Sequence, residues 1–263
     1  MSHAIAPSPV LLEIIEQHIA VLTLNRPEAR NAISSEMTGL IESCLIRIED
    51  DPQIRVCILA AKGEKTFCAG ADLKEIASGN ARNLATKRGG FAGFVQAPRR
   101  KPWIAAINAT AVGGGLEMAL ACDMLVCAEQ AELVLPEVKR GLVAAGGGMF
   151  RLPRVLPRAV ALEMIVSGEP LSARRAYELG MANYLVAQEQ VFETALNLAR
   201  KIASAGPLAV RESLQLAHRS TDCSLEALWG LNREAAHRVL TSEDARIGPK
   251  AFLERRPAQW TGR

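Results

Sequence analysis

Two glutamates lie beside small, glycine-rich stretches, a setting that suits proton transfer. Glu117 follows three successive glycines, Gly113–Gly115, where the pattern predicts the first turn of a helix. The positive end of a helix dipole favours the carboxylate form, so Glu117 is suited to act as a base. The N–H groups of the same glycines could stabilise a negative oxygen that develops in a transition state. The alternative is a glutamate that only matches the dipole of its helix.

The second glutamate, Glu137, follows Leu135 and Pro136 in an otherwise apolar stretch. If the fold buries this stretch, the pKa of Glu137 rises and its side chain holds a proton. Two carboxyl groups in contrasting surroundings suit the paired acid and base of a proton-transfer reaction. The alternative is a solvated loop glutamate, because neighbours in sequence need not be neighbours in space.

A third candidate is the loop Phe67–Lys74, which runs from a predicted strand into a helix. Its small residues Ala69, Gly70 and Ala71 allow a ligand to approach the backbone closely. Their N–H groups, at a helix start, point outward as a preformed anion site. The alternative is an ordinary tight turn in which Asp72 caps the helix.

Several other chemistries lose support. The glycine run completes neither the Gly-x-Gly-x-x-Gly fingerprint of dinucleotide binding nor a nucleotide-binding Gly-x-x-x-x-Gly-Lys-Ser/Thr loop. The six cysteines form no Cys-x-x-Cys pair and the four histidines lie far from paired cysteines, so a metal site and thiol catalysis are disfavoured. A net charge of +3 and an aromatic content of 4% give little support for a nucleic-acid partner.

The pattern of helices and strands that would position these residues indicates an α/β fold. The chain has 263 residues, of which 49% are hydrophobic and 22% charged, as in an ordinary globular protein. Apolar periodicity predicts a helix from Ser34 to Asp50. Short apolar runs predict strands, most of them buried on both faces as in a parallel sheet. These are Val10–Ile15, Ile19–Leu24, Val56–Ala60, Trp103–Ile107 and Met124–Ala128.

The last third of the chain has mainly helical periodicity, interrupted by a short strand at Tyr184–Val186. Gly180 and Gly206 stand where a helix end favours a left-handed residue. We therefore expect a core over residues 1–190 and a helical region over residues 191–263, which covers the core or another subunit. The predicted helices are Arg158–Ser167, Ala173–Leu179, Gln188–Ala205, Pro207–Ala217 and Ser224–Leu240, with one more beginning near Thr241.

Targeting segments are not expected. The stretch Met1–Val10 lacks a basic start followed by an apolar run, and no apolar run is long enough to span a membrane. We expect a soluble protein of the cytoplasm, with no membrane partner.

Taken together, the motifs resemble the enoyl-CoA hydratase (crotonase) superfamily over essentially the whole chain. The resemblance implies a core of repeated ββα units wound in a spiral, with C-terminal helices that form a homo-trimer or, by pairing of trimers, a hexamer. The motifs are Leu24–Pro27, Arg30–Ala32, Phe67–Lys74, Lys101–Asn108, Val112–Leu120, Cys122-Asp123, Pro136-Glu137 and Ser242–Arg263.

The resemblance also implies a mechanism. The N–H groups of Ala71 and Gly114 would form an oxyanion hole for the thioester carbonyl of an acyl-CoA. Glu117 would activate a water that adds at C3, and Glu137 would give a proton to C2. No metal or redox cofactor is implied, because coenzyme A arrives as part of the substrate. The remaining residues implied to contact the substrate are Ala29, Arg30, Ala69, Asp72, Leu73, Lys74, Gly113, Pro136, Ala145, Phe252 and Arg255.

Several functions within this fold stay open. The stretch Gly89–Gly93 and the ending Phe252–Arg263 look closest to the carnitinyl-CoA dehydratase-like branch. Ala109 and Ala144-Ala145 stand where the family often has glycine, or proline and glycine, which affects the expected acyl preference. Double-bond isomerisation is a second enzymatic alternative. A non-catalytic acyl-CoA-binding or RNA-associated member of the fold is a third.

Overall fold

The computed structural model describes residues 8–263, so most of the stretch Met1–Val10 lies outside the described residues. A six-stranded sheet forms the centre of the molecule, with β1 and β2 antiparallel and the other neighbours parallel. All five residues of β7 are buried, as a parallel strand covered on both faces requires. The strand order is β1 (Val10–Ile15), β2 (Ile19–Leu24), β3 (Val56–Ala61), β7 (Trp103–Ile107), β9 (Met124–Ala128) and β12 (Tyr184–Val186).

A smaller sheet of four short strands runs beside the first. Its order is β11 (Leu171–Ser172), β10 (Glu132–Val134), β8 (Thr110–Val112) and β4 (Thr66–Cys68). The chain alternates between the two sheets, because β3 leads to β4, β7 to β8 and β9 to β10. Each pair is followed by a helical turn, respectively α2 (Leu73–Ala77), α3 (Gly114–Leu120) and the 3-10 helix η3 (Glu137–Arg140). This repetition confirms the expected spiral of ββα units.

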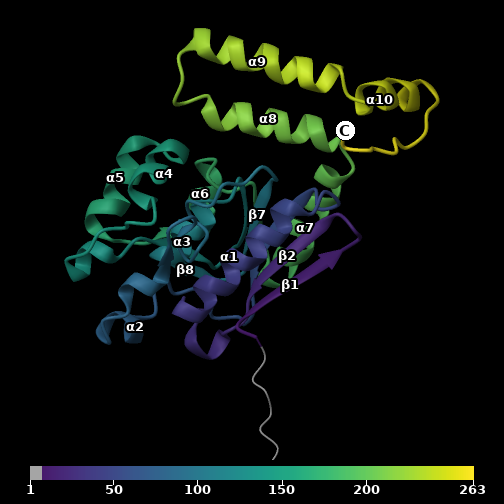
Figure 1. Cartoon of the computed structure of the whole chain (residues 1–263). Helices are drawn as coiled ribbons and strands as arrows, with labels where there is room; N and C mark the ends of the chain where they lie inside the picture. Colours follow the sequence, from purple (N-terminus) through teal and green to yellow (C-terminus); the bar gives the residue numbers. More distant parts are fainter. Residues whose placement is uncertain (1–7) are drawn as a thin grey trace, which may run out of the picture.

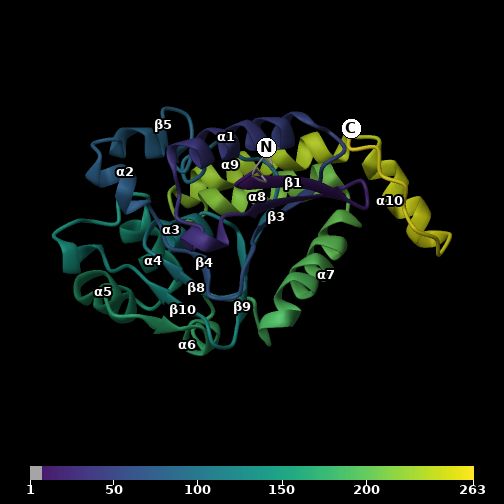
Figure 2. The same ribbon diagram turned by 90° about the horizontal axis from the view of Figure 1, so that it is seen from below.

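Two long helices cover the six-stranded sheet. Helix α1 (Ser35–Asp50) contacts β1 and β2, and α7 (Val191–Ala203) contacts β2, β3, β7 and β9. Figure 2 shows α1 and α7 on opposite sides of β1 and β3. The side chain of Ser34 accepts a hydrogen bond from the amide of Met37 and so caps α1, at the boundary that the sequence predicts.

The remaining helices lie on two sides of this core. Helices α4 to α6 gather beside the smaller sheet, whereas α8 and α9 form an antiparallel pair along one end of the molecule, followed by α10 (Figure 1). Their bounds are α4 (Gly148–Val155), α5 (Arg158–Ser167), α6 (Ala173–Glu178), α8 (Pro207–Arg219), α9 (Leu225–Leu240) and α10 (Asp244–Leu253). The short elements are η1 (Pro27–Ala29), η2 (Ala81–Leu84), η4 (Gln188–Gln190) and the hairpin of β5 (Ala85–Thr86) with β6 (Gly90–Phe91).

Two glycines of the helical region, Gly180 and Gly206, were expected at helix ends, and only the first expectation is confirmed. Gly180 has a φ of 81°, as a left-handed helix end requires. The prediction for Gly206 is wrong, because its φ is −62° and it stands at the N-terminal cap of α8, directly before Pro207. Proline suits the first helical position, so this glycine belongs to a helix start and not to a helix end. Within residues 8–263, no helix combines the length and the hydropathy needed to cross a bilayer.

Candidate active site

A cavity of about 550 Å³ opens between α2, α3 and η3, beside the ends of β4 and β8. It collects most of the residues that the sequence singled out. The predicted site residues in its wall are Ala69, Ala71, Leu73, Gly113, Gly114, Glu117, Pro136, Glu137 and Ala145.

The other predicted contact residues lie outside the wall of this cavity. Arg30 accepts a hydrogen bond of 3.0 Å on its carbonyl from the amide of Ala69, next to Ala29 in the preceding turn. Asp72 is buried and caps α2 by accepting a hydrogen bond from the amide of Lys74, whose side chain is exposed. Phe252, on α10, is 82% exposed, and Arg255 follows the end of that helix. The two C-terminal residues are therefore not brought to the cavity by their own chain. They lie on the C-terminal arm, which consists of α10 and the turn after it and projects from the rest of the molecule in Figure 2.

Glu117 is almost completely buried in the first turn of α3, with 3% of the residue exposed. Its Oε1 accepts a hydrogen bond of 2.9 Å from the amide of Gly148, at the start of α4. Burial raises the pKa of Glu117, the amides of Gly148 and Gly146 oppose that rise, and the charge of Glu137 adds to it. The net shift is therefore opposite to the one expected from the helix start, because loss of solvent outweighs the hydrogen bonds from the Gly148 and Gly146 amides.

Glu137 begins η3 and faces the same cavity. Burial raises its pKa, as the apolar sequence around it predicts. Its Oε2 is buried and accepts no hydrogen bond from the described part of the chain. A methyl group at Gly113 would lie 2.8 Å from Glu137 Oε1, so only glycine leaves room for this carboxyl group. The two carboxyl groups thus share one cavity, and both favour the protonated form more than an exposed glutamate does.

Two backbone amides complete the wall. The loop after β4 and the start of α3 are in contact, since a methyl group at Gly70 would lie 3.0 Å from the amide nitrogen of Gly114. The amides of Ala71 and Gly114 find no acceptor among residues 8–263, whereas the flanking Asp72 amide donates to the carbonyl of Ile33. Both free amides belong to residues that line the cavity. An oxygen atom placed there could accept from both.

Buried polar side chains, to which sequence reasoning assigned no role, hold the loop Phe67–Lys74 in place. Asn31 is fully buried, and its Nδ2 donates to the carbonyls of Lys62, Thr66 and Phe67. Arg26 donates to Asp72 Oδ2 at 2.8 Å. These residues lie in the motifs Leu24–Pro27 and Arg30–Ala32, and a buried asparagine among apolar neighbours is the signal that could have revealed this support.

A second support, which no sequence signal revealed, lies behind Glu117. Arg151, on α4, donates from Nη1 to the carbonyl of Gly146 at 2.8 Å and from Nη2 to the carbonyl of Val95. A methyl group at Gly146 would lie 2.6 Å from Glu117 Oε2. The loop that surrounds the Glu117 carboxyl group is therefore fixed from behind by a half-buried guanidinium group.

The cysteines near this region are not nucleophiles. Cys68 is fully buried, and burial raises the pKa of its thiol to about 12. The thiolate is the reactive form, so Cys68 is inert at neutral pH. Among the described residues, no cluster of three or more His, Cys, Asp or Glu side chains could hold a metal ion.

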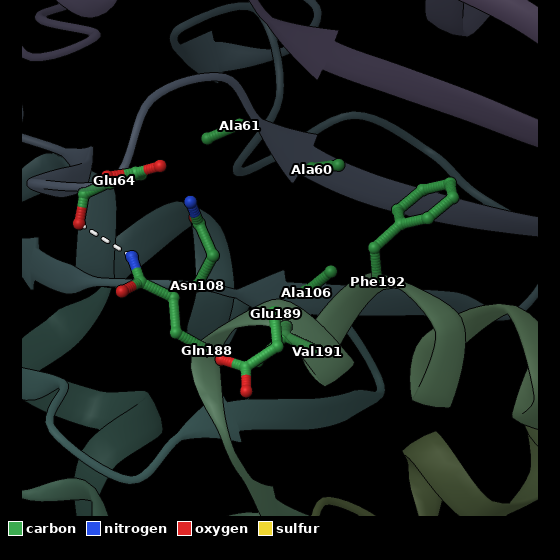
Figure 3. A pocket seen from close by; sticks show the side chains of 9 residues that line it. All are labelled: Ala60, Ala61, Glu64, Ala106, Asn108, Gln188, Glu189, Val191 and Phe192. Atoms are coloured by element: carbon green, nitrogen blue, oxygen red, sulfur yellow. Dashed lines mark hydrogen bonds between the residues drawn. The ribbon is translucent and has the colours of Figure 1, made fainter.

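A separate cavity of about 420 Å³ lies at the carboxyl ends of β3 and β7, against η4 and the start of α7. Figure 3 shows that Glu64 and Glu189 come from different sides of it, and Gln188 Nε2 donates to the Glu64 carbonyl at 2.7 Å. Both carboxyl groups belong to exposed residues. It therefore offers no buried pair of acids and suits proton transfer less well than the first cavity.

Comparisons with known proteins agree with this arrangement. Residues 14–263 match the family described as enoyl-CoA hydratase/isomerase. The carnitinyl-CoA dehydratase of Proteus mirabilis is 41% identical over 247 residues, which cover 92% of this chain and 94% of that protein. The carnitinyl-CoA dehydratase of Salmonella typhi is 40% identical over 250 residues, which cover 93% and 95%.

Solved structures are similar over nearly the full length. The enoyl-CoA hydratase of Mycobacterium tuberculosis has a TM-score of 0.93 and 38% identity, covering 98% of this chain and 100% of that one. The carnitinyl-CoA hydratase of Mycobacterium avium has a TM-score of 0.77 and 39% identity, with the same coverage.

Proposed function

Because the chain belongs to the enoyl-CoA hydratase/isomerase family, we propose that it catalyses the reversible hydration of a 2-enoyl-CoA thioester to a 3-hydroxyacyl-CoA. The observation that carries the proposal is one cavity lined by two carboxyl groups and two free amides. The carboxyl groups are those of the buried Glu117 and the half-buried Glu137, and the amides are those of Ala71 and Gly114. The names of the similar proteins support an activity of the hydro-lyase type on a CoA thioester.

In the proposed mechanism, the amides of Ala71 and Gly114 hold the thioester oxygen. Glu117 takes a proton from water, the water oxygen bonds to C3, and the electron pair of the double bond moves onto the thioester oxygen as an enolate. Glu137 then gives its proton to C2. The two amides stabilise the charge that develops, while the two glutamates move protons only.

The reaction needs a protonated Glu137 and an ionised Glu117, and the surroundings of the two acids act differently on these needs. Burial raises the pKa of Glu137, and its Oε2 receives no hydrogen bond within residues 8–263, so the group is suited to hold a proton. Glu117 must be ionised, and its bond from the Gly148 amide favours that form against burial. The reaction needs no metal or redox cofactor, because water and protons balance it.

The direct test is a panel of short, long, branched and aromatic 2-enoyl-CoAs, followed by loss of the conjugated thioester absorbance. We expect turnover of at least one member by the parent protein. Calorimetric binding of CoA thioesters without turnover of any of them would contradict hydration and favour a non-catalytic acyl-CoA-binding protein.

Dehydration of carnitinyl-CoA is a second candidate, favoured by the names of the 40–41% identical relatives. It would use the same four groups in the reverse direction. Comparing kcat/KM for crotonyl-CoA with that for its trimethylammonium derivative separates the two substrates. Isomerisation of a 3-enoyl-CoA is distinguished by turnover that survives Glu117→Gln.

We also propose that the chain assembles as a homo-trimer, and that two trimers can pair into a hexamer. Large apolar side chains are exposed on α9 and α10, among them Leu225, Trp229, Phe252 and Leu253. Exposed apolar groups of this size on neighbouring helices favour burial against another subunit. In such an assembly Phe252 and Arg255 would reach the coenzyme A bound by a neighbour.

A further inference from the structure

A polar cavity of about 220 Å³ lies behind the candidate active site, at the amino ends of β7 and β9. Gln96 lines both cavities, so the two are neighbours. The charged residues in the wall of the smaller cavity come from four parts of the chain. They are Arg99 and Lys101 before β7, Asp123 before β9, Arg151 on α4 and His218 near the end of α8.

The guanidinium groups of Arg99 and Arg151 have no carboxylate in direct contact among residues 8–263. Within residues 8–263, neither forms an ion pair with a carboxylate, and their hydrogen bonds go to backbone carbonyls. The Arg99 group lies 4.4 Å from the centre of the Phe94 ring, and its Nη1 is buried without a partner in the described part of the chain. Burial and the nearby Arg99 charge lower the pKa of Arg151, and the charge of Glu117 opposes them only in part.

The one carboxylate in the wall is already engaged. Asp123 Oδ2 accepts a hydrogen bond of 2.7 Å from the amide of Trp103, and Oδ1 is 2.7 Å from His218 Nε2. Lys101 adds a further positive charge, although its Nζ donates to the carbonyls of Ile48 and Asp51. The wall therefore carries three fixed positive charges, with a fourth when His218 is protonated, against a single negative charge.

We infer that this cavity binds a small oxyanion of the phosphate or sulfate type. Buried positive charges are costly without a partner, and guanidinium groups match the oxygens of such anions with several donors at once. A cavity of 220 Å³ is smaller than the sites that hold drug-sized ligands, so it fits a single tetrahedral ion and not a nucleotide.

The bound anion would also support the neighbouring active site. Arg151 donates to the Gly146 carbonyl in the loop that surrounds Glu117. An anion bound between Arg99 and Arg151 would hold this guanidinium group in place. The site is independent of the proposed hydration, and its test contains no CoA compound.

The test measures thermal stability and calorimetric binding with millimolar phosphate, sulfate, acetate or chloride, at constant pH and ionic strength. We expect phosphate and sulfate to bind and to raise the melting temperature, and acetate and chloride to do so far less. Arg99→Gln should weaken phosphate binding roughly tenfold or more, since it removes a charge-assisted donor. Arg219→Gln, an exposed arginine on the same helix end as His218 but outside the cavity wall, is the matched control and should leave binding unchanged.

A second variant keeps the test decisive if Arg99→Gln does not fold. Ala97 lines the cavity, so Ala97→Asp places a carboxylate at its wall. This internal anion should raise the melting temperature in phosphate-free buffer and abolish the response to phosphate. The inference is overturned if the parent protein does not respond to phosphate or sulfate, if Arg99→Gln and Arg219→Gln respond equally, or if Ala97→Asp keeps the full response.

Discussion

The amide of Gly148 donates a 2.9 Å hydrogen bond to the carboxyl group of Glu117, across two helices that meet at the cavity. Gly148 is the first residue of α4 and Glu117 lies in the first turn of α3. The carboxyl group is thereby held at one position by a helix start other than its own. A general base needs this kind of fixed position, because proton transfer requires close approach to the attacking water.

Replacing Glu117 by glutamine should therefore abolish most of the hydration activity without unfolding the protein. The amide side chain can still accept from Gly148, but it cannot take a proton from water. We expect kcat for crotonyl-CoA to fall by about 10²–10⁴-fold, with little change in KM. Glu132→Gln, an exposed glutamate on the neighbouring β10, is the control and should keep full activity. Equal activity of the two variants would remove Glu117 from the mechanism.

The raised pKa values of both glutamates predict how stability depends on pH. Each group binds its proton more tightly in the folded chain than in the unfolded chain. Its stabilising contribution is complete below the unfolded pKa and is lost as the pH rises through the folded pKa. Glu137→Gln should therefore have little effect on the melting temperature at about pH 4 and raise it at pH 8. A melting-temperature difference that does not grow with pH, or an equal growth in Glu132→Gln, would contradict this prediction.

The space around Glu117 predicts the effect of a single methyl group. Gly146→Ala places its Cβ 2.6 Å from Glu117 Oε2, so the carboxyl group must move away from its bond with Gly148. We expect kcat to fall by roughly tenfold or more, while the folded structure is kept. Gly39→Ala on α1 meets no atom within 4 Å and should leave kcat unchanged. Unchanged activity in Gly146→Ala, measured with crotonyl-CoA, would show that the position of Glu117 is not critical.

The buried side chain of Asn31 supports the loop Phe67–Lys74, so its replacement should destabilise the folded protein. Its Nδ2 donates to three carbonyls in a fully buried site. Asn31→Asp removes these donors and places an acid against carbonyl oxygens, which should cost about 2–4 kcal/mol in the free energy of unfolding. Urea denaturation measures this cost. An equal change in Asn25→Asp, an asparagine that donates to one carbonyl at the surface, would mean that the buried site of Asn31 is not special.

Local signals in the sequence predict much of the fold but less of its smaller, four-stranded sheet. Apolar runs and capping serines place β3, β7, β9, α1 and α9 within a few residues, because burial and capping act on the segment itself. The strands β4, β8 and β10 have only three residues each and show no periodicity of their own. They form because the neighbouring segments bring them together, which is a property of the whole chain.

The candidate site, too, is only partly predictable from the sequence. The two glutamates and the glycine loops are visible as residue types beside one another in the sequence. The net pKa of Glu117 is not, since it depends on burial by α4 and on the charge of Glu137. The support from Arg151 is not visible either, because the Gly146 and Val95 carbonyls that it joins lie 5 and 56 residues away along the chain. Contacts of this kind need the folded structure.

The C-terminal arm gives the last prediction, on the proposed assembly. Phe252 and Leu253 are neighbours at the end of α10 and are equally exposed, each at 82%. If Phe252 contacts coenzyme A on a neighbouring subunit, Phe252→Ala should raise KM for crotonyl-CoA several-fold and leave kcat nearly unchanged, since it removes binding far from the reacting carbons. Leu253→Ala is the matched control, and light scattering verifies that both variants keep the oligomeric state of the parent protein. Equal KM values in the two variants, with that state intact, would show that Phe252 does not contact the substrate.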